Sequence, residues 1–383
     1  MSNYSKIIDS ELITYRFGLK LGHIGVNYII FLIYICHESR YQMLTVKVVD
    51  NKVTLVESEL PNVNDDEMLV RMQSCGICGS DLEKVYGNYG MKSLRVGHEP
   101  AGVVIKVGKN LKKFKEGDRV FVHHHVSCYS CRYCLQGNYT MCNNYQTSNI
   151  DPCGLSEQFI VPKWNVEHGG VLKLPESMSY DEAALIEPFA CCIRGLNKIS
   201  IKHGDNVAIL GAGPTGVMHT LLAKLWGANN IVVSDVNDFR LKFVEKYGVT
   251  TVNLNTQNLD DVVNNCTEGL GVDVTILATG SIEAFESSLK ITRRGGKILL
   301  FGVPSVGSRF AIDLNLLYSN EQIIIPSYGA SEIETNQALS LMADKLIDLL
   351  PLVTHRFQIR ESHIAFKCAH EGSDAMKVLI VTS

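Results

Sequence analysis

After residue 42 the chain begins with short apolar runs that are separated by turn residues. From Met43 to about residue 126, runs rich in β-branched side chains alternate with glycine, asparagine and aspartate, as at 107–110 and 116–118. Such runs predict strands, and the residues between them predict tight connections. The expected strands are 46–49, 53–56, 68–72, 102–107 and 119–122, followed later by 157–161. We expect a compact β-barrel-like unit.

From about residue 189 the pattern changes to an alternation of strands and helices. Short apolar runs are followed, in most cases, by segments with helical periodicity. The expected strands are 207–210, 231–234, 251–253, 274–278, 297–301 and 322–325, and the expected helices are 215–226, 239–247, 258–266 and 282–291. This alternation predicts a doubly wound parallel sheet of the α/β class. An amphipathic helix over 335–346 and the segment 353–383 then return to the first unit.

The length of 383 residues favours two domains. We assign residues 43–188 to the β-rich domain, 189–326 to the domain with the parallel sheet, and 327–383 to the β-rich domain again. Residues 1–42 do not share this pattern, because their apolar run at 28–35 is too short to span a bilayer and no small-residue cleavage site follows it. We expect an extension outside the fold, with Met43 as the natural start.

Composition narrows the class of protein. Apolar residues make up 46% of the chain and charged residues 20%, as in globular proteins. A net charge of −4, without a basic block, gives no electrostatic basis for binding nucleic acid or an anionic membrane surface. Twelve cysteines would be compatible with disulfides, but four of them have a metal-binding spacing, which requires thiolates. We therefore expect a reducing, cytoplasmic location.

The metal-binding spacing is C-x2-C-x2-C-x7-C, within a lobe at 126–145. Four thiolates this close, on a loop broken by Gly137 and Asn138, can surround one tetrahedral Zn²⁺ with every position filled. Because no position is left for a substrate, we predict a structural zinc. Its ligands are Cys128, Cys131, Cys134 and Cys142.

A glycine motif follows the first strand of the parallel sheet. Gly211, Gly213 and Gly216 form GxGxxG before a helix, which indicates a dinucleotide-binding turn. Asp235 ends the next strand, where a carboxylate binds the adenosine ribose and repels a 2′-phosphate, so we predict NAD rather than NADP. Arg240 is expected to stack over adenine or to lie in solvent. Further candidates at this sheet edge are Pro214, Thr215, Ala278, Gly302 and Val303.

A second metal constellation lies upstream of the cysteine lobe. Cys78 offers a soft anionic ligand and His98 a neutral one. A catalytic zinc has about three protein ligands and one exchangeable position. Glu99 and Glu187 are both candidates for the third ligand, directly or through water. A lone buried cysteine or histidine is more often part of a core, but the combination beside a nucleotide motif favours a catalytic metal site.

Several motifs occur in a fixed order, namely CGICGSD, GHEPAGVV, the cysteine lobe, ALIEPFACC, GAGPTG and THRF. As a set they resemble the zinc-dependent medium-chain dehydrogenase/reductases of the alcohol dehydrogenase superfamily, nearest to the sorbitol and threonine dehydrogenases. The resemblance covers 43–383. It implies a GroES-like catalytic domain, a Rossmann domain, an active site in the cleft between them, two zinc ions per subunit, and a homodimer or homotetramer.

The resemblance also implies roles for individual residues. It places Cys78, His98 and Glu99 at catalytic-zinc positions, and Glu187 at an acidic position used by the polyol-dehydrogenase branch. Asp81 matches a carboxylate that supports these ligands.

The reaction that the resemblance implies is transfer of a hydride from an alcohol to NAD, with zinc lowering the pKa of the alcohol. Ser80 is the candidate for accepting the hydroxyl proton. Much of the family has a histidine three residues further on, where this chain has Glu83. The final proton acceptor is therefore open between Glu83 and water held by Glu99 or Glu187.

We expect oxidation of a small secondary alcohol of the polyol or sugar-derivative type. Threonine 3-dehydrogenation, oxidation of a sugar phosphate and reduction of an aldehyde are alternatives. A decayed nucleotide-binding protein is the non-enzymatic alternative, and the intact metal ligands argue against it. His124 and Arg356 are weaker candidates for contacts with the substrate and the pyrophosphate, against a solvated imidazole and a surface ion pair. The apolar segment 310–317 is a candidate for pairing subunits.

Overall fold

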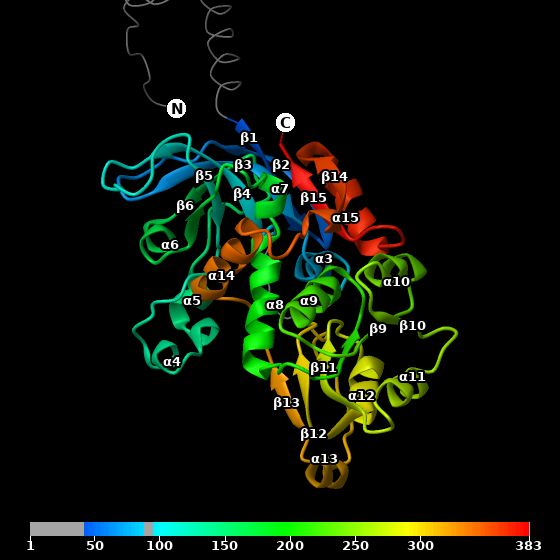
Figure 1. Cartoon of the computed structure of the whole chain (residues 1–383). Coiled ribbons are helices and arrows are strands. Elements are labelled where there is room, and N and C mark those ends of the chain that lie inside the picture. The colour runs from blue at the N-terminus through cyan, green and yellow to red at the C-terminus, as the bar shows by residue number, and fades with distance from the viewer. Residues whose placement is uncertain (1–41, 88–94, 383) are drawn as a thin grey trace, which may run out of the picture. The chain divides into compact units, whose positions relative to one another are not determined.

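The computed structural model describes residues 42–87 and 95–382. The expected extension over 1–42 lies outside the described residues except for Gln42, which begins the first strand. From there on the strands form a two-stranded sheet, a six-stranded sheet and a seven-stranded sheet (Figure 1).

The β-rich part contains the two-stranded and seven-stranded sheets. The larger sheet has the order β14-β15-β3-β4-β5-β7, with β6 paired to β3. The strands are β1 (Gln42–Val49), β2 (Lys52–Glu59), β3 (Met68–Gly76), β4 (Glu99–Val107), β5 (Arg119–Val122), β6 (Gln158–Val161), β7 (Val171–Lys173), β14 (Val353–Gln358) and β15 (Lys377–Val381). Met72, Phe159 and Phe366 belong to the buried apolar cluster that joins this sheet to helix α15 (Ser362–Glu371). The predicted β-rich unit is confirmed.

Short helices connect the strands of this part of the chain. They are α3 (Gly79–Val85), α4 (Arg132–Leu135), η1 (Tyr139–Met141), α5 (Asn143–Thr147), α6 (Lys163–Glu167), α7 (Tyr180–Ala183), η2 (Leu350–Leu352) and η3 (Ile359–Glu361).

Strands β3 and β4 are longer than the apolar pattern predicts. The prediction ended the first at residue 72 and began the second at 102, because the small and polar residues between do not alternate with apolar ones. In the structure the two strands pair antiparallel as far as Gly76 opposite Glu99. Cross-strand pairing therefore overrides the local pattern, and it brings the segments just beyond these two residues together.

The six-stranded sheet is parallel throughout and has the order β10-β9-β8-β11-β12-β13. Its strands are β8 (Val207–Leu210), β9 (Ile231–Asp235), β10 (Thr250–Asn253), β11 (Val272–Leu277), β12 (Thr292–Leu300) and β13 (Ile323–Pro326). Its helices are α9 (Pro214–Leu225), α10 (Asp238–Glu245), α11 (Leu259–Cys266), α12 (Ile282–Ile291) and α13 (Leu314–Asn320). The order in which the strands are added to the sheet reverses between β8 and β11, and the carboxyl ends of these two strands form the crevice where a dinucleotide binds in such folds. The predicted doubly wound sheet is confirmed.

Two further helices connect the sheets. Helix α8 (Ile186–Ile199) runs through residue 188, where we placed a domain boundary, and it packs against α9 and α14 (Glu332–Ala343). The apolar pattern did not predict α8, because Pro188 suggests a break, yet proline is tolerated in the first turn of a helix. Helix α14 begins three residues before the predicted start at 335, since Ser331 and Glu334 form a capping box. Each helix of the described chain is too short or too polar to cross a membrane.

Candidate active site

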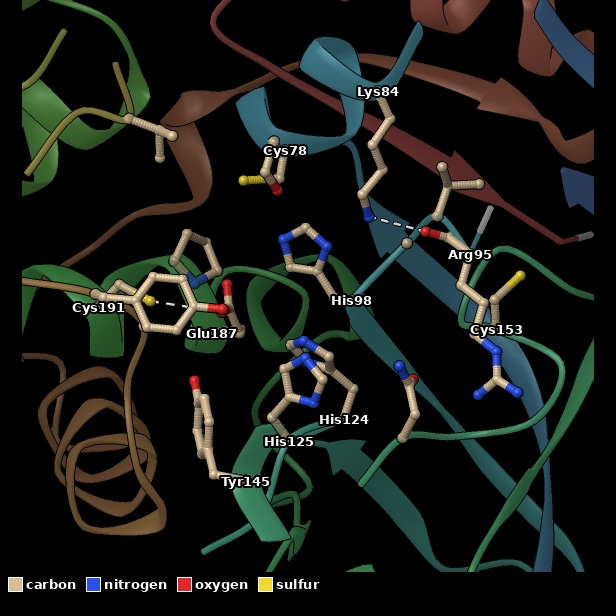
Figure 2. A pocket seen from close by; sticks show the side chains of 18 of the residues that line it. Cys78, Lys84, Arg95, His98, His124, His125, Tyr145, Cys153, Glu187 and Cys191 are labelled. Carbon is tan, nitrogen blue, oxygen red and sulfur yellow. Dashed lines mark hydrogen bonds between the residues drawn. The ribbon is translucent and has the colours of Figure 1, made fainter. Parts of the chain in front are cut away.

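The metal-binding side chains lie at the paired ends of β3 and β4. Cys78 is the N-cap of α3, directly after β3, and His98 directly precedes β4. The ligand atoms of Cys78, His98 and Glu99 all lie within 4.8 Å of one another. Figure 2 shows Cys78, His98 and Glu187 arranged around one point of a cavity. The structure thus brings the predicted ligands together, with a sulfur, an imidazole and carboxylates as a zinc site requires.

Asp81 lies behind these ligands and is fully buried. Its Oδ1 lies 3.5 Å from Nδ1 of His98, and its Oδ2 accepts from the backbone N–H of Cys78 at 3.3 Å. Burial by itself would raise the pKa of Asp81, but the charge and hydrogen bond of His98, with Lys84, lower it to about 2. The carboxylate therefore orients the imidazole, which leaves Nε2 of His98 as the nitrogen available to a metal.

A buried lysine that the sequence analysis missed holds Glu99. Nζ of Lys377, from β15, lies 2.7 Å from Oε1 of Glu99 and 2.5 Å from its Oε2. Burial by itself would lower the pKa of Lys377, but Glu99 raises it, so the ammonium stays charged. Gly76 makes room for this pair, because a Cβ at that position would lie 1.7 Å from Oε2 of Glu99. No local motif marks Lys377; only the pairing of β15 with β3 brings it here.

Glu187 approaches the cavity from the first turn of α8. Its Oε1 accepts from the thiol of Cys191 at 3.5 Å, and the residue lines the cavity together with Cys78 and His98. In contrast to Glu99, it has no cationic partner among the described residues. Glu99 nevertheless lies within 4.8 Å of the ligand atoms of Cys78 and His98, so both carboxylates stay candidates for the third ligand.

The cavity has a volume of about 310 Å³ and connects the metal-binding side chains with the nucleotide-binding edge of the parallel sheet. Ser80 and His124 line it, as do Thr215 and Val303 of the predicted nucleotide site. Burial, and to a smaller extent the charges of His125 and His98, lowers the pKa of His124 well below its ordinary value. This imidazole is therefore neutral. His124 thus lies at the cavity, and its contact with a substrate stays a prediction.

Two other predicted residues lie elsewhere. Glu83 does not line the cavity; its carboxylate lies beside Gly87, where an added Cβ would be 1.9 Å from Oε2. Arg356 pairs with Asp181 at 2.6 Å, as in the competing interpretation of a surface ion pair. No sequence motif predicts where the side chains of Glu83 and Arg356 lie, because each depends on the rotamer that the side chain adopts in the folded protein.

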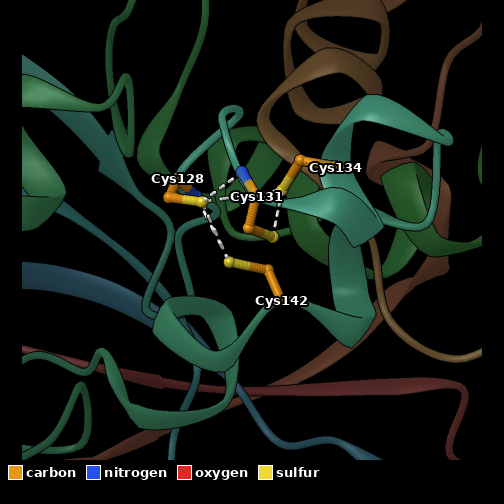
Figure 3. A group of neighbouring side chains, drawn as sticks. All are labelled: Cys128, Cys131, Cys134 and Cys142. Carbon is orange, nitrogen blue, oxygen red and sulfur yellow. Dashed lines mark hydrogen bonds between the residues drawn. The ribbon is translucent and has the colours of Figure 1, made fainter.

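The four cysteines of the lobe converge as predicted (Figure 3). The sulfur–sulfur distances are 3.5 Å for Cys128–Cys142, 3.6 Å for Cys131–Cys134 and 3.9 Å for Cys128–Cys134. A tetrahedral zinc with bonds of about 2.3 Å separates its sulfur ligands by about 3.8 Å. Hydrogen bonds from Ser130 lower the pKa of Cys128 to about 6, whereas burial raises the pKa of Cys134 to about 12. The donor set and spacing therefore fit a closed zinc site.

The glycine motif forms the tight turn between β8 and α9. Gly211 has φ of +109°, and a Cβ at Gly216 would lie 1.9 Å from the carbonyl oxygen of Gly211. Gly213 is the N-cap of α9 and Pro214 its first residue, so free N–H groups face the crevice. Ala278 directly follows β11. Gly302 lies against the backbone of the next residue, Thr279, because a Cβ added to Gly302 would lie 2.3 Å from the carbonyl carbon of Thr279.

Asp235 and Arg240 both lie next to this turn. Oδ2 of Asp235 accepts from the N–H of Ala212 at 2.7 Å, and Oδ1 accepts from Val236 and Asn237 at 2.7 and 2.9 Å. The carboxylate thus holds the turn. Nη1 of Arg240 lies 3.9 Å from the Cβ position of Gly213, so its guanidinium lies beside the turn and not in open solvent.

Comparison with known proteins agrees with this geometry. Residues 64–176 match the alcohol dehydrogenase GroES-like domain, and residues 214–344 match the zinc-binding dehydrogenase model. Sorbitol dehydrogenase of Bacillus subtilis is 33% identical over 331 residues, covering 84% of this chain and 92% of the relative. L-threonine 3-dehydrogenase of Vibrio cholerae is 31% identical, with 84% and 94% covered. The crystal structure of L-idonate 5-dehydrogenase from Escherichia coli is similar with a TM-score of 0.77 at 25% identity, covering 89% of this chain and 98% of that one.

The fold and the site define a two-domain, metal-dependent dehydrogenase with a nucleotide cofactor. The chain belongs to the zinc-dependent medium-chain dehydrogenase family, as its motifs predicted.

We predict that Gly76→Ala disrupts the site. The new methyl group collides with Glu99 and with Cε of Lys377, 2.7 Å away, so the ion pair must separate. We expect the free energy of unfolding to fall by about 3 kcal/mol, the upper end of the overpacking range, as measured by urea denaturation. Gly79→Ala is the control, because a Cβ there meets no atom within 4 Å. Equal stability of the two variants would contradict the close fit around Gly76.

Proposed function

We propose that this protein oxidises a neutral secondary alcohol of the polyol type and transfers its hydride to NAD. The observation that carries the proposal is the shared cavity: Cys78, His98 and Glu187 line one end, and Thr215 and Val303 of the nucleotide site line it too. An alcohol held beside these metal-binding side chains would share the cavity with a nicotinamide that enters along the sheet edge.

Cys78, His98 and Glu187 would hold the catalytic zinc, with Glu99 kept on Lys377. When bound there, zinc supplies a Lewis acid that favours the alkoxide, and NAD supplies the hydride acceptor. The buried ion pair is the reason for choosing Glu187, since a carboxylate that is already paired with an ammonium is a poorer ligand.

Ser80 accepts the proton of the alcohol at its Oγ in this scheme and passes its own hydroxyl proton on. It lies in the first turn of α3, two residues after Cys78, and it lines the cavity. Because Glu83 lies beside Gly87, we assign the onward step to water next to Glu187.

The charges of the cavity favour a neutral substrate. Among the residues that the structure describes, two cations line it, Lys84 and Arg95, and each is paired with a carboxylate. Nζ of Lys84 lies 3.6 Å from Oδ1 of Asp81, and Nη2 of Arg95 lies 3.3 Å from Oδ1 of Asp151. A sugar phosphate would have to displace one of these carboxylates. Neutral hydroxyl groups can instead hydrogen-bond to the polar lining side chains His124, Tyr145, Gln146, Asn149 and Tyr328.

We also propose a cytoplasmic homo-oligomer, dimeric or tetrameric, that is bound to neither membrane nor nucleic acid. Reduced cysteines in the metal lobe favour that compartment. For subunit pairing, Leu314 and Tyr318 of α13 are 70% and 83% exposed beside the sheet-edge strand β13.

The substrate class is tested with a panel of substrates and NAD, followed by absorbance of NADH. We expect turnover of neutral polyols such as sorbitol, with kcat/KM at least about tenfold above that of threonine or a sugar phosphate, which corresponds to one lost ionic contact. Highest activity with a sugar phosphate would contradict the charge argument. Absence of turnover, with fewer than two zinc ions per subunit, would favour the non-enzymatic alternative.

The metal ligands are distinguished by exchanging each carboxylate for its amide. Glu187→Gln should lower the affinity of the catalytic zinc by about 10- to 100-fold while the melting temperature of the zinc-free protein stays constant. Glu99→Gln should keep the zinc and lower that melting temperature, because Lys377 is left buried without a counter-charge. Zinc is measured by chelator competition. The reverse pattern would make Glu99 the ligand.

Asp235 is expected to determine the choice of cofactor. NADH should bind at least about tenfold more tightly than NADPH, because the carboxylate repels a 2′-phosphate. Asp235→Asn removes the charge and one of the two acceptor oxygens that hold the turn, so the preference for NADH over NADPH should narrow and the affinity for NADH should also fall. Titration of nucleotide fluorescence measures both affinities. Tighter binding of NADPH by the unaltered protein would refute the prediction.

A further inference from the structure

Tyr129 has a backbone conformation that is rare for a residue with a side chain. It lies in the cysteine lobe between the ligands Cys128 and Cys131, with φ of +55°. Residues other than glycine persist in this left-handed region when their surroundings hold them there. The contacts of the Tyr129 side chain show what holds it.

The hydroxyl of Tyr129 is bound to the first residue of α14. It donates to Oε2 of Glu332 at 2.6 Å and accepts from the backbone N–H of Glu332 at 3.2 Å. Burial, together with the charge of Glu332, raises the pKa of Tyr129, so the phenol keeps the proton that it donates. The amino end of α14 stabilises the carboxylate in turn.

The same carboxylate also holds His123. Oε1 of Glu332 lies 2.8 Å from Nδ1 of His123, and both side chains are buried. His123 directly precedes His124 and His125, which line the cavity. One carboxylate therefore joins the metal lobe to the segment that carries the cavity imidazoles. Nε2 of His123 is buried and has no hydrogen-bond partner in the described chain, so Glu332 is the side chain that fixes this ring.

The lobe forms part of the cavity wall as well. Cys142 is the N-cap of α5, and Tyr145 and Gln146 from that helix line the cavity. Directly after α5, the carbonyl oxygen of Ser148 lies 2.6 Å from Nδ1 of His125. The position of a zinc ligand thus determines where these cavity residues lie.

We propose that occupation of the four-cysteine site is coupled to the shape of the substrate cavity, and that Glu332 is the positioning residue that carries the coupling. With the lobe filled, Cys142 fixes α5 and Tyr129 presents its hydroxyl to Glu332, which holds His123 and the imidazoles next to it. Coupling between two sites is reciprocal in affinity, so a ligand in the cavity also strengthens the binding of metal in the lobe. The identity of that ligand rests on the proposed function, whereas the metal measurements do not.

The test compares Tyr129→Phe with Tyr139→Phe. The first variant removes the hydroxyl and keeps the ring. The second variant makes the same change in the same lobe. The hydroxyl of Tyr139 forms no hydrogen bond within the part of the chain that the structure describes. The ring of Tyr139 nevertheless lies close to that of Tyr129, with 5.2 Å between the ring centroids. Release of zinc to a chelator is followed together with alkylation of the peptide 127–142, which assigns the metal to the lobe. Hydrogen exchange is measured over 123–126 and 143–149, and KM and kcat are measured with the best substrate of the panel.

We expect Tyr129→Phe to lose the lobe zinc about tenfold faster, as when a side chain supporting a metal site is removed. Exchange should rise in both segments, and KM should rise about fivefold with kcat nearly constant, the size of one lost hydrogen bond. Glu332→Gln should cause the same changes, and Tyr139→Phe should behave as the unaltered protein.

Two results would overturn the proposal. Equal zinc release from the two tyrosine variants would mean that the hydroxyl contact does not support the lobe. Faster release with unchanged exchange over 123–126 would mean that the contact serves the lobe alone. If no alcohol is oxidised, the proposed function fails, while zinc release and exchange still decide the coupling.

Discussion

The antiparallel register of β3 and β4 is the constraint on which the rest of the site depends. Gly76 lies opposite Glu99, so Cys78 and His98, just beyond the paired ends, reach the same point. Because side chains alternate across a strand, a shift of one residue would turn Glu99 to the other face and separate the sulfur from the imidazole. The metal-binding geometry is therefore a property of the sheet before it is a property of the ligands.

The same register explains why a C-terminal residue belongs to the site. Strand β15 pairs with β3, with Leu379 opposite Gly76, and this brings Lys377 to Glu99 in the sheet interior. A buried ion pair contributes little net stability, since desolvation opposes the attraction, but it does fix the position of its two groups. Here it distinguishes the surroundings of two carboxylates that look equivalent in the sequence, since Glu99 is paired with an ammonium and Glu187 lines the cavity.

The cysteine lobe is more than an isolated support for the fold. Its last ligand caps the helix that carries Tyr145, and its Tyr129 reaches Glu332 on α14. Through Glu332 and His123 the lobe contacts the strand end that supplies His124 to the cavity. The cysteine lobe is thus joined by buried polar contacts to the segment that lines the cavity, although the two sets of predicted ligands come from separate motifs.

The sequence by itself determined the elements whose chemistry lies within a few residues. Helix 282–291 and strand 207–210 were predicted with the bounds that the structure has, and the four cysteines and the glycine turn follow directly from their spacing. Local spacing specifies such features because neighbouring residues share one short piece of backbone.

Only the tertiary structure decided the contacts between distant segments. Lys377 and Glu99 are 278 positions apart. Three further features also depend on the folded structure. They are the contact of Tyr129 with Glu332, the extension of β3 to Gly76 and the position of Glu83 away from the cavity. The physical reason is that partners of buried charges are chosen by strand register and helix packing, whereas the pattern of apolar residues specifies only which face of each element is buried.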